Sequence, residues 1–148
     1  MEEVVDELIV KAPAQRVWTA IRDPGEHAEW HPFVTGIEGE HVLGSKRRCR
    51  VSVGREPGTT EERCSTYDEG RTIAWKAEQE SSGFSRMVSD WSAGFSLEPD
   101  DTGATRVTAW SLFTPGRLSA RLMMPVIRRK FHATQRTILG ALKQHAER

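Results

Sequence analysis

The chain has 148 residues, of which 37% are apolar and 28% are charged, and its formal net charge is zero. This length predicts one domain, spanning residues 1–148, with a substantial core. A neutral chain is not expected to bind nucleic acid, whose partners carry excess positive charge. No apolar run approaches the ~18 residues of a membrane span, and the acidic N-terminus lacks the pattern of a secretion signal. We therefore expect a cytoplasmic protein without a membrane span.

The first elements are expected to be a strand and two short helices. An imperfect alternation of apolar and polar residues predicts a strand that ends at Pro13. Pro13 suits the first turn of a helix through residues 14–23, because proline needs no N–H partner there. An Asp-Pro-Gly sequence ends that helix, and one more helical turn is expected over residues 26–30.

Six further strands are expected, because alternating apolar and polar stretches are separated by turn residues. Short connections between successive strands predict an antiparallel meander. A Thr-Pro-Gly sequence ends the last strand and leads to the C-terminal segment. The strands cover residues 33–40, 46–54, 59–67, 72–80, 84–98 and 104–113.

The segment from Arg117 onward predicts a long amphipathic helix. It contains no acidic residue up to Ala146 but seven Lys or Arg residues. Pro125 marks either a kink or the first turn of a second, longer helix. Gln135 is expected on a different face from the apolar stripe. Steps of three and four residues give the stripe, which consists of Met124, Ile127, Phe131, Thr134, Ile138, Ala141 and His145.

These elements predict an α+β fold. A curved, seven-stranded antiparallel sheet wrapped around the long helix would bury the inner face of the sheet and the helical stripe together.

The order of motifs resembles a known superfamily. The run KAPAQRVWTAIRDPGEHAEWHPFV is similar to the N-terminal signature of the START-related polyketide cyclase/dehydrase and lipid-transport superfamily. The resemblance continues through Leu43-Gly44-Ser45, ERCSTYDEGRTIAW and GATRVT, and covers nearly the whole chain. It implies the helix-grip fold, in which sheet and helix enclose a mostly apolar cavity. Relatives hold polyketides, sterols, lipids or plant hormones there, and the fold does not decide among these ligands.

Side chains expected to face the interior are candidates for the wall of that cavity, although they would equally suit a closed core. Large aromatic rings and a flexible methionine suit an apolar ligand. Ser89 is a polar residue that faces inward by the same alternation. The candidate ligand-binding residues are Trp30, Phe33, Trp75, Met87, Ser89, Trp91, Phe95, Met124, Ile127 and Phe131.

Two polar residues are candidates for proton transfer. Glu62 falls on the same side of its strand as Cys64, the inner side by parity, where a carboxyl group suits a general acid or base. The alternatives are a solvated Glu62 near the open end of the sheet, or a bulge that reverses the parity. His31 lies between Trp30 and Pro32, in a loop that the resemblance places near the cavity mouth, and could titrate near neutral pH.

The remaining histidines and cysteines predict no further chemistry. The histidines show no metal-ligand spacing, so we predict neither a metal nor another cofactor. Cys49 and Cys64 are too few for a disulfide framework and suit buried apolar fillers. If residues 55–58 form the turn, the two cysteines are cross-strand neighbours and Arg50 opposes Arg63. A shift of two residues is the alternative register.

Trp110 does not fit a simple inside–outside pattern. Alternation from Val107 places Trp110 and Leu112 on the outer face of the last strand. Either a bulge re-aims the strand, or an exposed apolar patch marks a protein contact, of which a homodimer is one form.

Three functions are compatible with these observations. The first is a non-catalytic carrier of a hydrophobic small molecule. The second is a polyketide cyclase, aromatase or dehydratase in which Glu62 and His31 transfer protons. The third is a protein-interaction module, like the co-chaperone and ribosome-associated relatives that the resemblance implies. The interior aromatic residues favour a hydrophobic small molecule as partner, and the sequence does not separate binding from catalysis.

Overall fold

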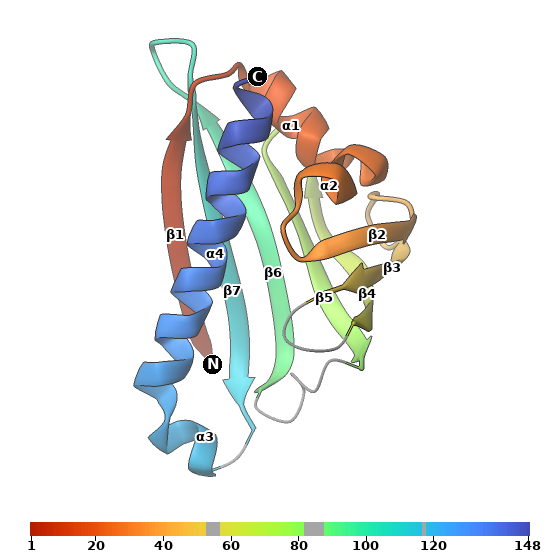
Figure 1. Cartoon of the computed structure of the whole chain (residues 1–148), viewed down its shortest axis with the longest axis vertical. Coiled ribbons are helices and arrows are strands. Elements are labelled where there is room, and N and C mark those ends of the chain that lie inside the picture. Colours follow the sequence, from red (N-terminus) through yellow and green to blue (C-terminus); the bar gives the residue numbers. More distant parts are fainter. Residues whose placement is uncertain (53–56, 82–87, 117) are drawn as a thin grey trace.

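A computed structural model, described over residues 1–52, 57–81, 88–116 and 118–148, shows one antiparallel sheet and a long C-terminal helix (Figure 1). The sheet has seven strands in the order β1-β7-β6-β5-β4-β3-β2. The predicted helix-grip, α+β fold is therefore confirmed. The strands are β1 (Glu2–Val10), β2 (Val34–Gly39), β3 (Lys46–Val51), β4 (Gly58–Asp68), β5 (Thr72–Glu80), β6 (Val88–Pro99) and β7 (Thr105–Pro115). The helices are α1 (Ala14–Arg22), α2 (Pro24–Trp30), α3 (Leu118–Leu122) and α4 (Met124–Ala146).

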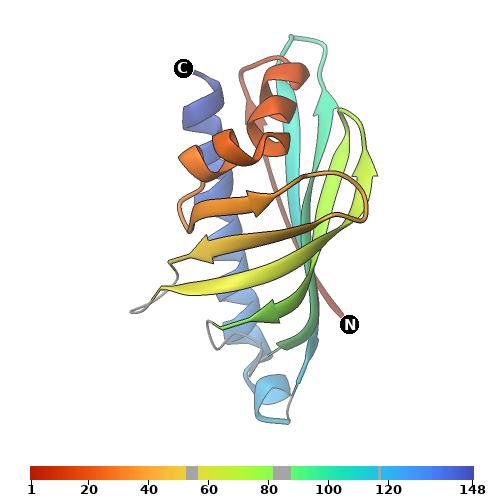
Figure 2. The same cartoon turned by 90° about the vertical axis from the view of Figure 1, so that its right-hand side faces the viewer.

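The sheet is strongly curved, so that β2, β3 and β4 run across the direction of β6 and β7 (Figure 2). Two irregularities in the β4–β5 pairing contribute to the bend, one between Glu61 and Glu62 and one between Cys64 and Thr66. Bulges of this kind bend a strand and increase its twist. The concave face encloses one side of α4, and α1 and α2 close one end.

The buried face of α4 differs from the predicted stripe. Ile127 and Phe131 are buried as predicted, but farther along the helix Leu139 and Leu142 are buried while Thr134 is exposed. The predicted stripe runs straight along the helix, whereas the sheet that covers it is twisted. The contacting face therefore rotates along α4, and its full set of buried residues is Ile127, Phe131, Gln135, Leu139, Leu142 and Ala146.

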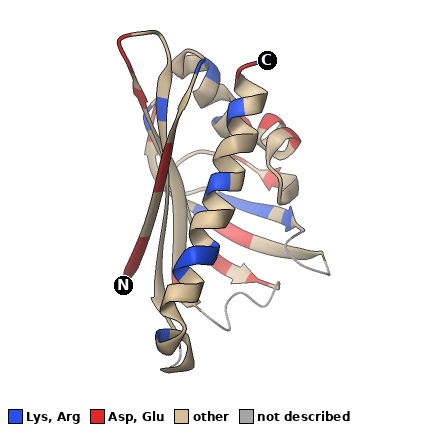
Figure 3. Ribbon diagram, turned by 60° about the vertical axis from the view of Figure 1, so that its left-hand side comes forward, with Lys and Arg blue, Asp and Glu red and all other residues tan. Residues whose placement is uncertain are grey.

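Gln135 was expected on another face and is only 4% exposed. Its side-chain amide donates to Asp6 Oδ2 at 2.8 Å, and its oxygen accepts from Ser111 Oγ at 2.7 Å. Asp6 also bonds to His132 (Nδ1 to Oδ2, 2.8 Å) and accepts from Arg136 Nε at 3.2 Å. Acidic residues of β1 thus lie alongside basic residues of α4 (Figure 3). This network fixes α4 against β1 and β7.

Pro125 lies in the first turn of α4, which begins at Met124, while α3 ends at Leu122. The second of the two predicted alternatives is therefore correct: proline opens a longer helix and does not kink one. Proline is tolerated at this position because the N–H groups of a first helical turn have no partner within the helix.

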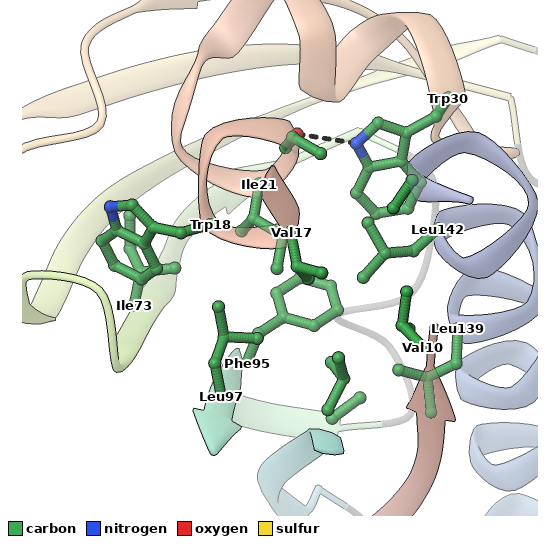
Figure 4. Close-up of a cluster of buried hydrophobic side chains, with 14 of the residues drawn as sticks. Val10, Val17, Trp18, Ile21, Trp30, Ile73, Phe95, Leu97, Leu139 and Leu142 are labelled. Atoms are coloured by element: carbon green, nitrogen blue, oxygen red, sulfur yellow. Dashed lines mark hydrogen bonds between the residues drawn. The ribbon is translucent and has the colours of Figure 1, made fainter. Parts of the chain in front are cut away.

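Two of the three hydrophobic clusters in the described part of the chain join the sheet to the helices, and the third lies on β2 and β3. The first joins α1, α2 and the C-terminal half of α4 to the sheet, through residues such as Val17, Ile21, Phe95 and Leu142 (Figure 4). The second lies at the α3 end, where the rings of Phe113 and Phe131 stack with centroids 4.3 Å apart. Its other buried members are Val4, Val88, Ala120 and Ile127, with Trp91 and Met124 packed against them.

Trp110 lies on the outer face, as the alternation predicts. β7 pairs with β1 residue by residue from Thr105 to Phe113, so the proposed bulge at Trp110 is wrong. The half-buried indole covers Gly94 of β6, where an added Cβ would come within 2.7 Å of Trp110 Cζ2. Gly94 therefore makes room for the indole. The protein contact stays a prediction.

The cysteines are not cross-strand neighbours. Cys49 opposes Thr60, and Arg50 opposes Thr59, so both predicted registers of this hairpin are wrong. The predicted turn was centred two residues too late, because β3 already ends at Val51 and β4 begins at Gly58, and residues 53–56 lie outside the described part of the chain. Both thiols are free and buried, and burial raises the pKa of Cys49 to about 11. They are therefore fillers, as predicted.

Candidate functional site

A buried ion pair lies on the concave face of β3 and β4. Arg47 donates to Glu62 Oε1 from Nε at 2.9 Å and from Nη2 at 2.7 Å, and Thr60 Oγ1 donates to Glu62 Oε2 at 3.0 Å. Arg47 and Glu62 are 7% and 6% exposed. The inward position predicted for Glu62 is confirmed, and the solvated alternative is wrong. Both carboxylate oxygens are engaged, so Glu62 serves as the counter-ion of Arg47.

Arg47 links this ion pair to an aromatic group. Its Nη1–H donates to His41 Nε2 at 2.9 Å, and its Cζ atom lies 3.7 Å from the centroid of the Trp75 ring. This is close enough for a cation–π interaction. His41 is 3% exposed, and its Nδ1 lies 3.3 Å from the carbonyl oxygen of Ile21, to which it donates as the neutral tautomer. The polar network therefore joins the sheet to the end of α1.

His27 of α2 and His31, which directly follows α2, complete the cluster. The His27 ring stacks on His31 with centroids 5.3 Å apart and meets the Trp75 ring at 5.7 Å. His31 Nδ1 accepts two backbone hydrogen bonds, from Phe33 N and Val34 N, each at 3.1 Å. The neutral His31 ring therefore carries its proton on Nε2 and presents an N–H donor.

These imidazoles are neutral at physiological pH. Burial, followed by the nearby charge of Arg47, lowers the pKa of His31 and of His41 to about 3. The same causes lower the pKa of His27 well below its usual value. The prediction that His31 titrates near neutral pH is therefore wrong, because the sequence revealed neither the burial of the ring nor the guanidinium close by.

Trp75 carries a hydrogen-bond donor that is not used within the described part of the chain. The residue is 4% exposed, and its Nε1 is buried with no hydrogen-bond partner there. Trp30 differs, because its Nε1–H donates to Ala20 O at 2.7 Å (Figure 4). An unsatisfied buried donor costs about 1–3 kcal/mol, so native proteins retain few of them. Trp75 Nε1 is thus a candidate contact for a ligand.

The predicted ligand-binding residues fall into two groups. Trp30, Trp75 and Phe95 belong to the first hydrophobic cluster, and Phe33 is partly buried beside His31. The others belong to the second cluster, toward α3. These are Trp91, Met124, Ile127 and Phe131.

Two predicted residues stand apart from these groups. Ser89 is exposed, and the prediction that it faces inward is wrong. A register shift between Ser89 and Ser92, with Asp90 at a φ of 50°, inserts an extra residue and makes Val88 the buried one. Met87 lies outside the described residues.

Sequence reasoning missed Arg47, His41 and Thr60. The signal for Arg47 was available, because alternation puts it on the same side of its strand as Cys49. A charged residue at an inward position predicts a buried counter-ion, and Glu62 was already identified on the facing strand. The described residues contain no group of three His, Cys, Asp or Glu side chains that could hold a metal ion.

A hollow of about 360 Å³ lies elsewhere, on the convex face of the sheet. Its lining includes Thr72, Ser96, Arg106 and Thr108, which alternate with the inward-facing residues of β5, β6 and β7. It is polar and open, so it is not the apolar cavity that the sequence predicts. The apolar cavity between the concave face of the sheet and α4 stays a prediction.

The fold and the buried polar network define a helix-grip domain whose interior combines aromatic rings with the Arg47–Glu62 ion pair. Residues 1–147 match the family described as polyketide cyclase/dehydrase and lipid transport. The chain belongs to this family, as its motifs predicted. No curated protein matches the chain closely enough to count as a relative. Among the described residues, no helix is long and apolar enough to cross a membrane.

Solved structures show the same fold at low sequence identity. The Zhui aromatase/cyclase from Streptomyces sp. R1128 superposes with a TM-score of 0.78 at 22% identity, covering 99% of this chain and 94% of that one. A START superfamily protein from Mycobacterium smegmatis gives 0.77 at 17% identity, with 98% and 97% covered. The di-domain ARO/CYC protein BexL, from the BE-7585A biosynthetic pathway, gives 0.83 at 19% identity, with 99% and 47% covered.

Proposed function

We propose that this protein binds a hydrophobic small molecule inside the grip and holds one of its oxygen atoms at Trp75 Nε1–H. The observation that carries the proposal is the buried indole donor without a partner in the described chain. A carbonyl or ether oxygen of a ligand would supply the missing acceptor and recover the cost of burying the donor. Membership of a family of polyketide cyclases and lipid carriers supports a ligand of this kind.

The residues around Trp75 favour a hydrogen bond from its Nε1–H to a ligand oxygen. Arg47, on the face of the ring, draws electron density from the indole and strengthens its N–H as a donor. His31 offers a second donor, Nε2–H, which bonds to no described residue. Aromatic side chains such as Trp30 and Phe95 provide apolar surface. A site with several donors favours an aromatic or polyketide-like ligand that carries acceptor oxygens.

The geometry favours ligand binding over proton transfer by Glu62 and His31. Glu62 is held by Arg47 and Thr60, and His31 uses its only lone pair on backbone N–H groups. Neither is free to accept a proton from a ligand. A cyclase or dehydratase activity is the second candidate, favoured by the donors, which could polarise a carbonyl group. That activity would require polarisation of the substrate and not a base at Glu62 or His31.

A matched pair of ligands tests the proposal by calorimetric titration. Acetonaphthone carries a carbonyl oxygen, whereas ethylnaphthalene has a similar shape and no acceptor. We expect the protein to bind the ketone about tenfold more tightly, the value of one recovered hydrogen bond. Trp75→Phe should abolish this preference while keeping affinity for the hydrocarbon. Trp110→Phe, on the outer face, is the control and should preserve the preference.

Two outcomes would count against the proposal. If the protein bound neither compound, the proposed apolar binding site would be wrong. A preference for the ketone that survives Trp75→Phe would place the acceptor contact elsewhere. Native mass spectrometry of freshly purified protein provides a complementary test, because a co-purified ligand without an acceptor oxygen would contradict the assignment.

A further inference from the structure

The end of the molecule formed by α3 and the start of α4 exposes a concentrated set of apolar side chains. Leu118 and Leu122 are 73% and 78% exposed, and Met123 and Val126 are 48% and 44% exposed. These four, here called the apolar tip, make up half of the exposed large apolar side chains in the described chain. In Figures 1 and 2, α3 forms the extremity of the molecule opposite the C-terminus.

Helix α3 exposes its large apolar side chains to solvent and buries its small one, which is unfavourable for solubility. Ala120, its smallest apolar residue, is buried against the second hydrophobic cluster. Leu118 and Leu122, four residues apart, share a face and both point into solvent. An ordinary amphipathic helix buries its largest apolar side chains. The exposed pair therefore indicates a surface that meets an apolar environment.

Basic side chains surround the apolar tip. Arg121, Arg129 and Lys130 are exposed, and the last two follow Val126 by three and four residues, which puts them on its face of α4. The sequence has no acidic residue from 102 to 146. Arg128 is paired with Glu2 at 2.9 Å and contributes little net charge. The tip thus combines aliphatic side chains with basic ones that pair with no acidic side chain in the described part of the chain. Figure 3 shows positions of Lys and Arg in blue on α3 and α4.

We infer that the apolar tip docks on the surface of an anionic lipid bilayer. Leu side chains with flanking Lys and Arg are the composition of segments that insert shallowly between lipid headgroups. A second copy of the chain would bring the same positive charges face to face in a symmetric contact. A protein partner is less suited, because the tip protrudes and its four side chains include no aromatic residue, the kind that dominates protein interfaces.

Vesicle co-sedimentation tests this inference with vesicles of phosphatidylcholine alone and of an equal mixture of phosphatidylcholine and phosphatidylglycerol. We expect binding only to the mixture, and release at high salt. The double variant Arg129→Gln/Lys130→Gln should partition at least tenfold less, since each basic residue contributes about fivefold near an anionic surface. Leu118→Ser/Leu122→Ser should also lose at least tenfold, because its apolar contact with the bilayer is removed.

The matched control is Val5→Ser/Ile9→Ser, which removes two apolar side chains exposed elsewhere, at 44% and 40% on β1. It should bind vesicles like the unaltered protein. The inference fails if the unaltered protein does not sediment with anionic vesicles at low salt, or if the control loses as much as the tip variant. Self-association that is lost in Leu118→Ser/Leu122→Ser, without vesicle binding, would assign the tip to a second copy and overturn the inference. The acetonaphthone titration concerns the interior, so its result is independent.

Discussion

Replacing Glu62 by Gln should strongly destabilise the protein, because it leaves the buried Arg47 guanidinium without a counter-ion. Both side chains are nearly inaccessible to solvent. Breaking a buried ion pair by removing one partner costs about 3–5 kcal/mol. Gln keeps one acceptor for Arg47, and His41 Nε2 remains another, so we expect the lower end, about 3 kcal/mol. For a chain of this length, the melting temperature should fall by about 6–12 °C.

The same hairpin supplies a matched control. Arg48 and Glu61 are paired at 3.5 Å on the other face, with side chains 57% and 38% exposed. An exposed pair of this kind contributes less than about 1 kcal/mol. Glu61→Gln should therefore hardly change the free energy of unfolding.

Urea unfolding at pH 7 measures both variants. The double variant Arg47→Met/Glu62→Leu should recover most of the stability, because it removes both charges from the interior. The reasoning would be refuted if Glu62→Gln and Glu61→Gln cost the same, or if the double variant were as unstable as Glu62→Gln.

Three further predictions concern stability and can be measured by urea unfolding. Below pH about 6.5 the unfolded chain protonates His31 and His41, while the folded chain, with pKa values of about 3 for both, does not. The free energy of unfolding should therefore be greatest above that pH and should fall on acidification by about 1.4 kcal/mol per pH unit for each histidine. A His31→Asn variant whose free energy of unfolding falls equally steeply with pH would contradict this. Asp6→Ala should cost about 1–3 kcal/mol, because it leaves the buried Gln135 amide without its acceptor; Glu3→Ala on the exposed side of β1 is the control, and equal effects would argue against the network. Gly94→Ala should cost about 1–3 kcal/mol, since the new Cβ would meet Ala74 Cβ at 2.6 Å and Trp110; the cost should shrink in a Trp110→Ala background, and an unchanged cost would place the strain elsewhere.

Periodicity and turn residues were sufficient to predict the fold. Alternation predicted the strands, and Pro13 and Pro125 marked the starts of helices. These signals are local, because each depends on residues close together in the chain.

The details of the candidate site depend on contacts between distant segments and were harder to predict. The Arg47–Glu62 pair requires the register of β3 on β4, which no local pattern determined. Ser89 was misplaced because a bulge at Asp90 reverses the parity of β6. Gln135 was misplaced because a polar residue was assumed to face solvent, although Asp6 and Ser111 satisfy it inside.

The central claim is that Trp75 Nε1–H binds an oxygen atom of a hydrophobic ligand. The chain has five tryptophans, so the indole N–H proton of Trp75 can be assigned by comparison with Trp75→Phe in a nitrogen-15 NMR spectrum. On titration with acetonaphthone, we expect this resonance to move downfield, as a proton does when it enters a hydrogen bond, while that of Trp110 stays in place. A Trp75 resonance that remains unchanged at saturating ketone, while other residues of the interior shift, would contradict the account.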